Sequence, residues 1–524
     1  MTQPSAVGER YLRRTFEGMW ELFAEGQGPL GTNGASRRYA EFGRVALPPA
    51  IGRPRQSGGD RPPGTVPSWL PEFLWLGFGL HSLEVGPSSG WPYHRTTPSA
   101  RCLYPTEVYV WLAAGDGLPS GLYHYDAPHH GLDLLRSAVA SEVVGRAVGR
   151  DLAGVTAAAF VTSVFHRTAA RYRNYAYRLC SQEAGMTVGC LAFAAEACGF
   201  RPAVCYRFLD QAVQQLLGLP DGIESPFAVL TLTESEGPVV PPELTGSVSV
   251  SAATANLSPL TVPTEESTTA TPQFCPEALE LDSSSRLVRL DSIRPCVGDA
   301  TGCPPSAIAP LDPVADGTSE FDCGISTFDP GALIGRESGP PNFQPIPVSM
   351  TFAQLCGIVR RATTGEPPGD LRLPSVRAPL SIFVVANRVT DLSAGVYRFA
   401  PGGPRVVHNA PVGRRLQRIT RSTNINACAS PAVLYVCTDA KLYLDGFGDR
   451  GYRIMNLEAG ALAQRLSIAA AAHALAARVS NGYDTPALRE LLGLGSSWDF
   501  PVFQIFLAKL RLAPRYRFPL GGCT

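Results

Sequence analysis

One passage occurs twice in this chain, and the repeat constrains the fold more than any other feature of the sequence. Four short segments return in the same order at a nearly constant offset in residue number. They are Pro98-Ser99 and Pro374-Ser375, Gly121-Leu122-Tyr123 and Gly395-Val396-Tyr397, Tyr177-Arg178 to Glu183-Ala184-Gly185 and Tyr452-Arg453 to Glu458-Ala459-Gly460, and Leu216–Leu219 and Leu491–Leu494. Such a repeat indicates a tandem duplication. Two copies of one fold in one chain can form the interface that a homodimer makes with two.

The length of 524 residues accommodates two copies of roughly 200 residues, each large enough for its own core. Residues 1–50 are predicted to be an N-terminal extension, and residues 51–235 the first domain. Residues 236–325 are rich in Ser, Thr, Pro and acidic side chains and are interpreted as a linker. Residues 326–524 form the second, more divergent domain.

The composition excludes several classes of function. The formal net charge is zero, which argues against a strongly basic nucleic-acid-binding surface. The most apolar stretch, Ala461–Val479, is interrupted by charged side chains, so we expect a buried helix and no membrane association. The 13 cysteines are scattered, without two pairs at metal-ligand spacing, so no metal site is predicted. A cytoplasmic protein with reduced thiols is expected.

Each copy has the same predicted order of elements, which is strand, strand, long helix, strand, helix, strand. In the first copy the segments are Glu107–Ala113, Gly121–Tyr125, Tyr175–Cys198, Ala203–Phe208, Asp210–Leu217 and Phe227–Leu232. In the second copy they are Ser381–Ala386, Gly395–Phe399, a helix over Ile454–Arg478, Pro486–Leu492 and Val502–Leu507. A helix over Tyr11–Phe23 is also predicted. Helices and strands mixed without regular βαβ alternation favour an α+β fold.

The segment Pro98–Tyr109 resembles the Pro-Ser-x-x-x-Leu-Tyr-Pro-x-Glu-x-Tyr signature of SagB-type azoline dehydrogenases, which belong to the FMN-dependent nitroreductase superfamily. Gly121–Asp126, Tyr175–Gly185 and Leu216–Leu219 resemble later elements of that family, so the likeness covers most of the first copy. The second copy lacks the Leu-Tyr-Pro. The resemblance implies a nitroreductase-like fold present twice and packed as an intramolecular pseudo-dimer, with FMN at the interface.

A second element of this family is an Arg-x-Ser tripeptide that holds the FMN phosphate. Arg55-Gln56-Ser57 and Arg336-Glu337-Ser338 lie at the same spacing before a leucine of an apolar segment, Leu74 in the first copy and Leu355 in the second. A guanidinium binds phosphate with two parallel hydrogen bonds, and a hydroxyl can complete the site. The alternative is a solvated arginine in a loop rich in Gly and Pro.

The family's Pro-Ser loop contacts the flavin from the partner subunit. The resemblance therefore implies two positions, one formed by Arg336 and Ser338 with Pro98 and Ser99, the other by Arg55 and Ser57 with Pro374 and Ser375. Gly482, in Asn481–Asp484, resembles a family turn near the flavin. The first copy has Tyr206–Leu209 at that place, lacks the glycine, and is expected to crowd its position.

Azoline dehydrogenases carry a Lys-Tyr pair just before the Tyr-Arg element, where this chain has Arg171-Tyr172 and, in the second copy, Gly446-Phe447. Oxidation of a thiazoline removes a proton from one ring carbon and a hydride from the next. Arginine stays protonated and cannot be the base. Tyr172 is therefore the candidate base, and Arg171 is expected to stabilise its tyrosinate. The alternatives are a purely structural pair, or His166 as the base.

The predicted function is FMN-dependent oxidation of thiazoline or oxazoline rings to azoles in a peptide natural product, with dioxygen as electron acceptor. The implied substrate is an azoline-containing peptide, either a ribosomal precursor or carrier-bound, and a cyclodehydratase is a possible partner. Two alternatives stay open. One is an NAD(P)H-dependent nitroreductase-like oxidoreductase, and the other is a non-catalytic scaffold in an azole-forming complex. Bound FMN distinguishes the scaffold from the two enzymes.

Overall fold

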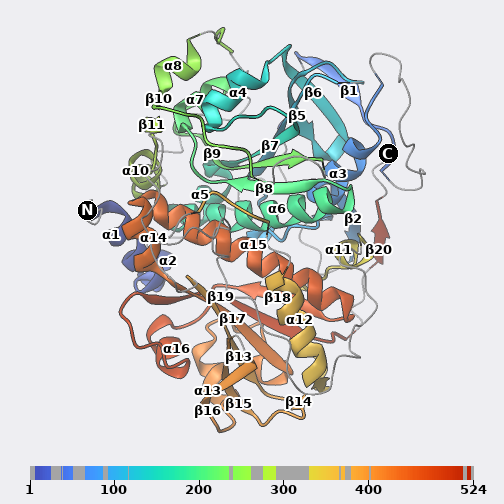
Figure 1. Cartoon of the computed structure of the whole chain (residues 1–524). Helices are drawn as coiled ribbons and strands as arrows, with labels where there is room; N and C mark the ends of the chain where they lie inside the picture. Colours follow the sequence, from blue (N-terminus) through green and yellow to red (C-terminus); the bar gives the residue numbers. More distant parts are fainter. Residues whose placement is uncertain are drawn as a thin grey trace.

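Two β-sheets face each other across a pair of long helices (Figure 1). The computed structural model describes residues 6–24, 37, 39, 41–50, 65–86, 92–115, 117–234, 240–255, 257–260, 275–290, 330–364, 367–371, 379–400, 403–511 and 516–520. The first half holds a seven-stranded sheet and the second half a six-stranded sheet.

The two sheets share one strand order. The first runs β1 (Gly43–Ala46), β6 (Gly131–Ser137), β5 (Gly121–Asp126), β4 (Thr106–Leu112), β7 (Val155–Val164), β9 (Glu224–Thr233) and β8 (Arg201–Cys205). The second runs β16 (Gly403–His408), β15 (Gly395–Ala400), β13 (Leu380–Ala386), β17 (Ala432–Asp439), β19 (Asp499–Ala508) and β18 (Ala476–Ser480). All these pairings are antiparallel. The two halves therefore have one topology, apart from the extra edge strand β1.

The long helices α6 (Ala176–Ala197) and α15 (Arg450–Ala472) lie side by side between the sheets (Figure 1). Their closest approach is at two glycines. A Cβ on Gly185 would collide with the carbonyl oxygen of Leu457, and a Cβ on Gly460 would collide with that of Gln182. In the repeat, Gly460 corresponds to Gly185 and Leu457 corresponds to Gln182, so the two contacts are equivalent. The halves are therefore related by an approximate two-fold axis and pack as an intramolecular pseudo-dimer.

Buried arginines on the same two helices reach across this axis. Arg178 donates to the Val502 carbonyl at 3.1 Å, and Arg453 donates to the Pro226 carbonyl at 3.2 Å. Both guanidinium groups are fully enclosed. Each helix is also covered by a second helix of its own half, α3 (Trp69–Phe78) on α6 and α12 (Phe352–Thr364) on α15. Leu74 and Leu355, the leucines to which the spacing of the two Arg-x-Ser tripeptides was counted, lie in these equivalent helices.

The N-terminal segment binds both halves. Helix α1 (Ala6–Phe16) packs Tyr11 against Tyr452 with ring centroids 5.1 Å apart, and the Thr15 and Tyr452 hydroxyls are 2.9 Å apart. The predicted single helix over Tyr11–Phe23 is wrong, because the chain turns at Glu17-Gly18 before α2 (Met19–Ala24).

Part of the predicted linker is packed on the rest of the chain. Helix α10 (Pro276–Ser284) contacts α1, and its Asp282 accepts a hydrogen bond from Ser225 at 2.8 Å. Strand β20 (Tyr516–Pro519), near the C-terminus, pairs with β2 (Leu80–Val85) of the first half. Figure 1 shows β20 beside β2, far from the second sheet in space. The halves are thus joined by exchanged segments as well as by α6 and α15.

The predicted helix over Ile454–Arg478 is wrong at its C-terminal end. Helix α15 ends at Ala472, Ala474 adopts a left-handed φ of 54°, and Ala476–Ser480 form the edge strand β18. Alanines favour a helix locally, but these residues pair with β19 as β8 pairs with β9. This difference matters because β18 lies at the candidate site.

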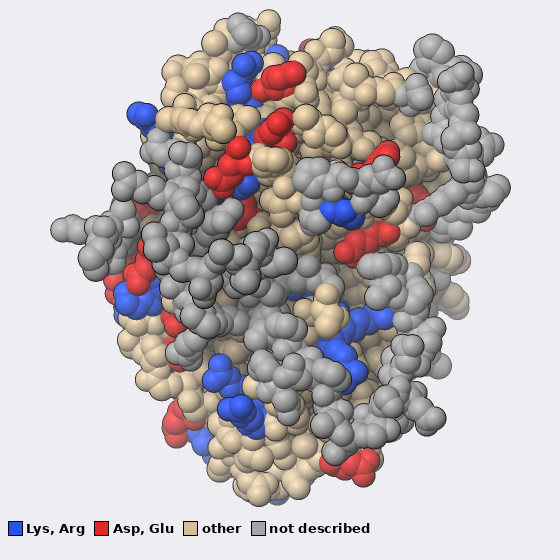
Figure 2. All heavy atoms as spheres, viewed as in Figure 1, with Lys and Arg blue, Asp and Glu red and all other residues tan. Residues whose placement is uncertain are grey.

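The described residues carry mixed charge. On the face drawn in Figure 2, acidic and basic side chains are interspersed over both halves. Within the described part of the chain, no helix is both long and apolar enough to cross a bilayer. The same residues contain no group of three or more His, Cys, Asp or Glu side chains placed to hold a metal ion.

Candidate functional site

The signature segment of the first half forms a strained loop between β3 (Tyr93–Arg95) and β4. Arg101, Cys102 and Tyr104 have φ values of 52°, 56° and 45°. Non-glycine residues with positive φ cost roughly 1–3 kcal/mol each, and they concentrate at functional sites. The loop is closed by Ser99, whose hydroxyl oxygen accepts a hydrogen bond from the Tyr104 N–H at 2.9 Å. Arg167 also stabilises the loop, because it donates a hydrogen bond to the Tyr104 carbonyl at 3.0 Å.

A buried carboxyl group lies beneath this loop. Thr106 donates to Glu183 of α6 at 3.3 Å, and Ser99 also hydrogen-bonds to this carboxyl. Burial raises the pKa of Glu183 to about 7, and the bonds from Ser99 and Thr106 and the charge of Arg95 limit that rise. The loop therefore rests on a group that changes charge near neutral pH.

The second half contributes two arginines to the site, Arg336, which follows helix α11 (Pro330–Ile334), and Arg478. We call these two residues the basic edge. Arg336 is 7% exposed and donates to the Ser338 hydroxyl at 2.6 Å. Arg478 of β18 donates to the carbonyl oxygens of Ser338, Gly339 and Pro340 at 3.4, 3.2 and 3.5 Å. Among the described residues no carboxylate lies within ion-pair distance of Arg478. The Arg336 and Arg478 guanidinium groups therefore lie on one side of the interface, and the charge of Glu337 acts on Arg478 there.

Contacts with the two long helices bring the basic edge and the loop together. Gln464 of α15 donates to the Thr96 carbonyl at 3.2 Å and to the Cys190 sulfur at 3.0 Å. Thr97 donates to the same sulfur at 3.5 Å. Burial raises the pKa of Cys190, and the charge of Arg336 opposes that rise, which places the guanidinium near Cys190. Arg336 and its partner Ser338 therefore lie near Cys190 of α6, the residue that Thr97 also contacts.

Arg478 approaches the same loop. Burial raises the pKa of Cys102, and the charge of Arg478 opposes that rise. Burial in turn lowers the pKa of Arg478 itself. Sequence reasoning missed Arg478 because it placed this residue in a helix. The repeat itself carried the missing signal, since Arg478 is the repeat counterpart of Ala203, a predicted strand residue.

The Asn481-Gly482 turn follows β18 and meets the start of α6. Asn481 donates to the Gln182 side chain at 2.6 Å, and the Gly482 carbonyl accepts from the Arg421 N–H at 2.9 Å. A Cβ on Gly482 would collide with the Ser422 hydroxyl. Only that hydroxyl, which can rotate, would have to move, so glycine is favoured in this turn and not required. The turn directly follows β18, the strand that carries Arg478.

Tyr172 ends helix α5 (Phe165–Tyr172) and is partly buried against Phe23, with ring centroids 6.2 Å apart. Burial raises the pKa of Tyr172, and Arg101 opposes this rise through its charge and a side-chain hydrogen bond. Arg171 acts on the phenol by charge with a smaller effect. Arg101, on the strained loop, therefore interacts with the Tyr172 phenol more strongly than Arg171, its neighbour in sequence. Nothing in the local sequence pattern singled out Arg101.

The equivalent position in the other half is filled. Tyr206, the counterpart of Asn481, donates its hydroxyl to Glu458, the counterpart of Glu183. Asp370 accepts from the backbone N–H groups of Tyr206 and Arg207 at 2.8 and 3.1 Å, and from Arg150 at 3.1 Å. The segment around Asp370 also bridges to β8 at Val204. Tyrosine, arginine and aspartate here occupy the place where the other half has Asn481 and Gly482.

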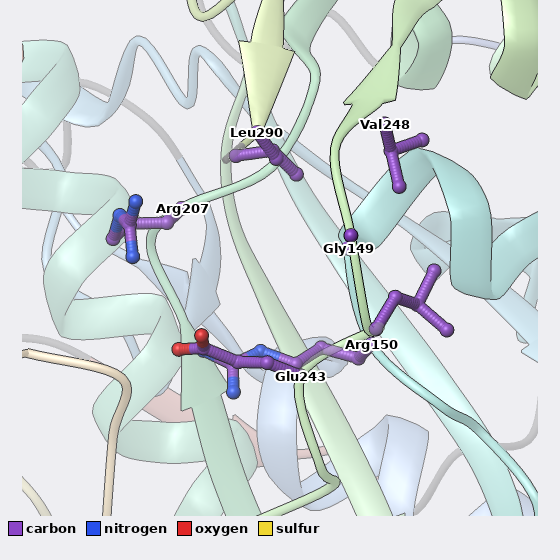
Figure 3. Close-up of a pocket in the computed structure, with 8 residues that line it drawn as sticks. Gly149, Arg150, Arg207, Glu243, Val248 and Leu290 are labelled. Carbon is purple, nitrogen blue, oxygen red and sulfur yellow. The ribbon is translucent and has the colours of Figure 1, made fainter. Parts of the chain in front are cut away.

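Arg207, the counterpart of Gly482, lines a small cavity with Arg150 and Glu243 (Figure 3). In Figure 3 the Arg150 and Glu243 side chains lie side by side, and Val248 and Leu290 lie on the other side of the cavity. The cavity volume is about 20 Å³, room for a single water molecule. Arg55, Ser57, Pro374 and Ser375, predicted at this position, lie outside the described residues.

Comparison with solved structures identifies the architecture. A putative nitroreductase from Anabaena variabilis aligns over 97% of this chain and 100% of its own, with 21% identity and a TM-score of 0.72. The fold is nitroreductase-like. It is present twice, as the two sheets of one order and the paired helices require.

Two further solved structures align with one part of the chain. The E. coli microcin synthetase McbBCD complex with truncated pro-MccB17 bound matches 45% of this chain and 89% of its own, at 19% identity and a TM-score of 0.29. A putative nitroreductase from Ralstonia eutropha matches 41% of this chain and 97% of its own, at 23% identity and a TM-score of 0.28. TM-scores this low carry no argument about this chain. No family model matches the sequence, and no curated protein matches it.

Proposed function

We propose that this chain is an FMN-dependent oxidoreductase of the SagB-type azoline dehydrogenase kind, which arose by tandem duplication and converts thiazoline or oxazoline rings of a peptide into azoles. The observation that carries the proposal is the meeting of Arg336, Ser338 and Arg478 from one half with the Pro98–Ser99 loop of the other. This meeting occurs within a nitroreductase-like fold, and the loop carries the family-like signature.

The residues at this position suit the phosphate of FMN. Arg478 hydrogen-bonds to backbone carbonyls, and the Glu337 carboxylate offsets part of its charge, so a dianionic group beside it would compensate the rest of a largely buried charge. Arg336 supplies a second guanidinium, and Ser338 a hydroxyl that already bonds to it. The proposed flavin-binding residues are Arg336, Ser338, Pro98, Ser99, Arg478 and Gly482.

Bound FMN would supply the acceptor for the hydride that leaves the azoline ring. The chain itself must take up the proton. Tyr172, as its tyrosinate, accepts that proton at its hydroxyl oxygen, and Arg101 stabilises the anion. Arg171 supports the same anion from further away. Dioxygen would take up the two electrons and two protons as hydrogen peroxide.

We propose that only one of the two positions binds flavin. Tyr206 and Asp370 fill the other with a hydrogen-bonded network that includes Glu458 and Arg150. The proposed Arg55, Ser57, Pro374 and Ser375 site would have to displace that network. The expected stoichiometry is therefore one FMN per chain.

The proposal extends to partners and compartment. The substrate is a peptide that already contains azolines, so a cyclodehydratase must act before this enzyme and is a possible partner. A cytoplasmic location follows from the reduced state expected for the scattered cysteines. The nine cysteines in the described ranges are all free of disulfides.

The test is to purify the full chain, quantify FMN by absorbance after denaturation, and incubate the protein with a thiazoline-containing peptide in air. We expect one FMN per chain, a mass decrease of two hydrogens per ring and formation of hydrogen peroxide. Flavin reduction by NADPH with nitroaromatic turnover, but no change in the peptide, would instead identify a nitroreductase-like enzyme. Failure to bind FMN would identify a scaffold.

A further inference from the structure

Trp20 is the only exposed tryptophan within the described ranges, and it is 37% exposed. It lies on α2, which belongs to neither copy of the repeat, and Figure 1 shows this helix where the two halves meet. Tryptophan is highly buried on average, and it is enriched among the residues that carry binding energy. The neighbours of Trp20 show which site it serves.

On one side, ring contacts connect Trp20 with the proposed proton acceptor. The indole packs edge-on against Phe23 of the same helix, with centroids 5.5 Å apart. Phe23 in turn packs against Tyr172 with centroids 6.2 Å apart. Phe23 and Tyr172 are both partly exposed. We call Trp20, Phe23 and Tyr172 the aromatic row, which ends at the phenol of the candidate site.

On the other side, Trp20 contacts the second half of the chain. The Arg421 guanidinium lies over the indole, 5.9 Å from the ring centroid, and forms an ion pair with Asp484. The backbone N–H of Arg421 donates to the Gly482 carbonyl at 2.9 Å. The aromatic row therefore lies between Tyr172 and the turn that carries the proposed flavin-binding Gly482.

The second half has no equivalent of this row. Phe447, the counterpart of Tyr172, has no hydroxyl, and helix α1 packs on the residues around it. The Gly8 N–H of α1 donates to the Asp449 carboxylate, and a Cβ on Gly8 would contact Leu444. The N-terminal segment therefore covers one of the two equivalent places with α1 and adds an exposed aromatic ring beside the other with α2.

The dimensions of the row fit a peptide substrate. The centroids of Trp20 and Tyr172 are at most about 12 Å apart, the sum of the two ring distances. An extended chain covers roughly 3.3–3.6 Å per residue. A peptide whose azoline lies at Tyr172 therefore reaches Trp20 with a residue about three positions away. Flat rings stack favourably on an exposed indole, and an azole is such a ring.

We propose that Trp20 is a substrate-binding residue, which stacks on an azole of the peptide about three positions from the reacting azoline. This inference rests on the proposed azoline oxidation and adds a preference for peptides that carry a second heterocycle. Trp20 holds the peptide and takes no part in proton or hydride transfer, so it acts on KM and leaves kcat unchanged.

Two synthetic peptides and four proteins test this role. One peptide carries a central thiazoline with a thiazole three positions before it and another three positions after it, and the second peptide has alanine in place of both thiazoles. The proteins are the full-length wild type, Trp20→Ala, Trp20→Phe and Trp498→Ala. Trp498 is the matched control, because it also lies under a cation, Arg13 of α1 at 4.9 Å, but makes no ring contact with the aromatic row among the described residues. The readouts are FMN per chain, the rate of hydrogen peroxide formation against peptide concentration, and quenching of indole fluorescence by the fully oxidised thiazole peptide.

Trp20→Ala should raise KM for the thiazole-flanked peptide roughly fivefold, with kcat and FMN content changed less than twofold. Trp20→Phe should restore most of the affinity, Trp498→Ala should change KM less than twofold, and the alanine peptide should show no difference between wild type and Trp20→Ala. The oxidised peptide should quench the wild type, and this quenching should be lost in Trp20→Phe.

Three outcomes overturn the inference while the proposed reaction stands. They are an unchanged KM in Trp20→Ala, an equal rise in KM in Trp498→Ala, and loss of FMN from Trp20→Ala, which would assign the residue to the cofactor site. A wild type that does not oxidise the peptide but is quenched through Trp20 would instead show that the reaction is wrong and the binding role is right. Absence of both oxidation and quenching would overturn both.

Discussion

Tyr206 donates its hydroxyl to the carboxylate of Glu458, whereas Glu183, the counterpart of Glu458, is held by Ser99 and Thr106. One carboxylate is thus covered by a phenol, and the other lies under a strained loop that faces two arginines. This asymmetry distinguishes the two halves more than their topology does, since the strand order is the same in both. It also gives each position its own experimental signature.

The filled position should matter for stability and leave flavin content unchanged. Asp370→Ala removes one of the two carboxylate partners of the buried Arg150, leaving Glu243, and the acceptor of two backbone N–H groups. Breaking a buried ion pair costs roughly 3–5 kcal/mol, so the thermal midpoint should fall while FMN per folded chain remains one. A rise toward two FMN per chain in this variant would show that the position is only blocked by Asp370.

The basic edge should control FMN affinity. A charge-assisted hydrogen bond contributes roughly 1.5–3 kcal/mol, so Arg336→Ala and Arg478→Ala should each weaken FMN binding by about 10- to 100-fold, as measured by quenching of flavin fluorescence. Arg388→Ala is the control, because the Arg388 side chain donates to the Cys428 and Ala429 carbonyls elsewhere in the second half. Unchanged FMN affinity in both Arg336→Ala and Arg478→Ala would show that these arginines do not bind the FMN phosphate.

The repeat predicted the two-fold arrangement because its spacing is preserved in segments whose residues are buried at the interface. Gly185 and Gly460 recur since each permits the same close approach of two helices. The alanine-rich end of the second long helix misled the prediction, because β18 is formed by pairing with β19 and local preference there points to a helix.

The site residues that sequence reasoning missed owe their positions to the tertiary fold. Arg101 reaches Tyr172 only because the loop adopts three left-handed residues in a short span, which no side-chain pattern encodes. Tyr206 could be predicted to crowd its position from the missing glycine, but its bond to Glu458 and the contact of Asp370 required the structure. Trp20 and Phe23 stand in an N-terminal extension whose residue pattern carries no sign of a contact with Tyr172.

Helix packing across the axis should be intolerant of a single added carbon. Gly185→Ala places a methyl group against the Leu457 carbonyl, and both helices are fixed by their own sheets. Overpacking of this kind costs roughly 1–3 kcal/mol or more, so the thermal midpoint should fall by several degrees. Gly115→Ala is the control, since no atom lies within 4 Å of its added Cβ. Equal midpoints for the two variants would contradict the close approach.

The carboxyl of Glu183 should make stability depend on pH. Its folded pKa of about 7 lies above the ordinary value of 4.5, so the folded state holds the proton more tightly. The contribution of Glu183 to stability should therefore be fully present below about pH 4.5, decrease as the pH rises toward 7, and be absent above, a total of roughly 3 kcal/mol. Glu183→Gln should abolish this component, whereas Glu41→Gln, an exposed control, should keep it. Parallel pH curves for wild type and Glu183→Gln would assign the pH dependence elsewhere.

Tyr172 should matter to the reaction more than to folding. Tyr172→Phe keeps the ring against Phe23 and removes only the hydroxyl. If that oxygen takes up the substrate proton, azoline oxidation should fall by roughly 10²–10⁴-fold with flavin content unchanged. Loss of flavin from this variant would show a structural role, and near-normal turnover would move the proton acceptor to His166 or to water.

The cation beside the phenol can be identified by the pH dependence of the same reaction. Arg101 opposes the burial-driven rise in the pKa of Tyr172 more than Arg171 does. Arg101→Gln should therefore shift the ascending limb of the pH–rate profile to higher pH, because the tyrosinate forms less readily without its hydrogen-bonded cation. Arg101→Lys should restore part of the shift. Arg171→Lys should be tolerated, and Arg171→Ala should shift the profile in the same direction by a smaller amount. A larger shift for Arg171→Ala than for Arg101→Gln would return the supporting role to the residue next to Tyr172 in sequence.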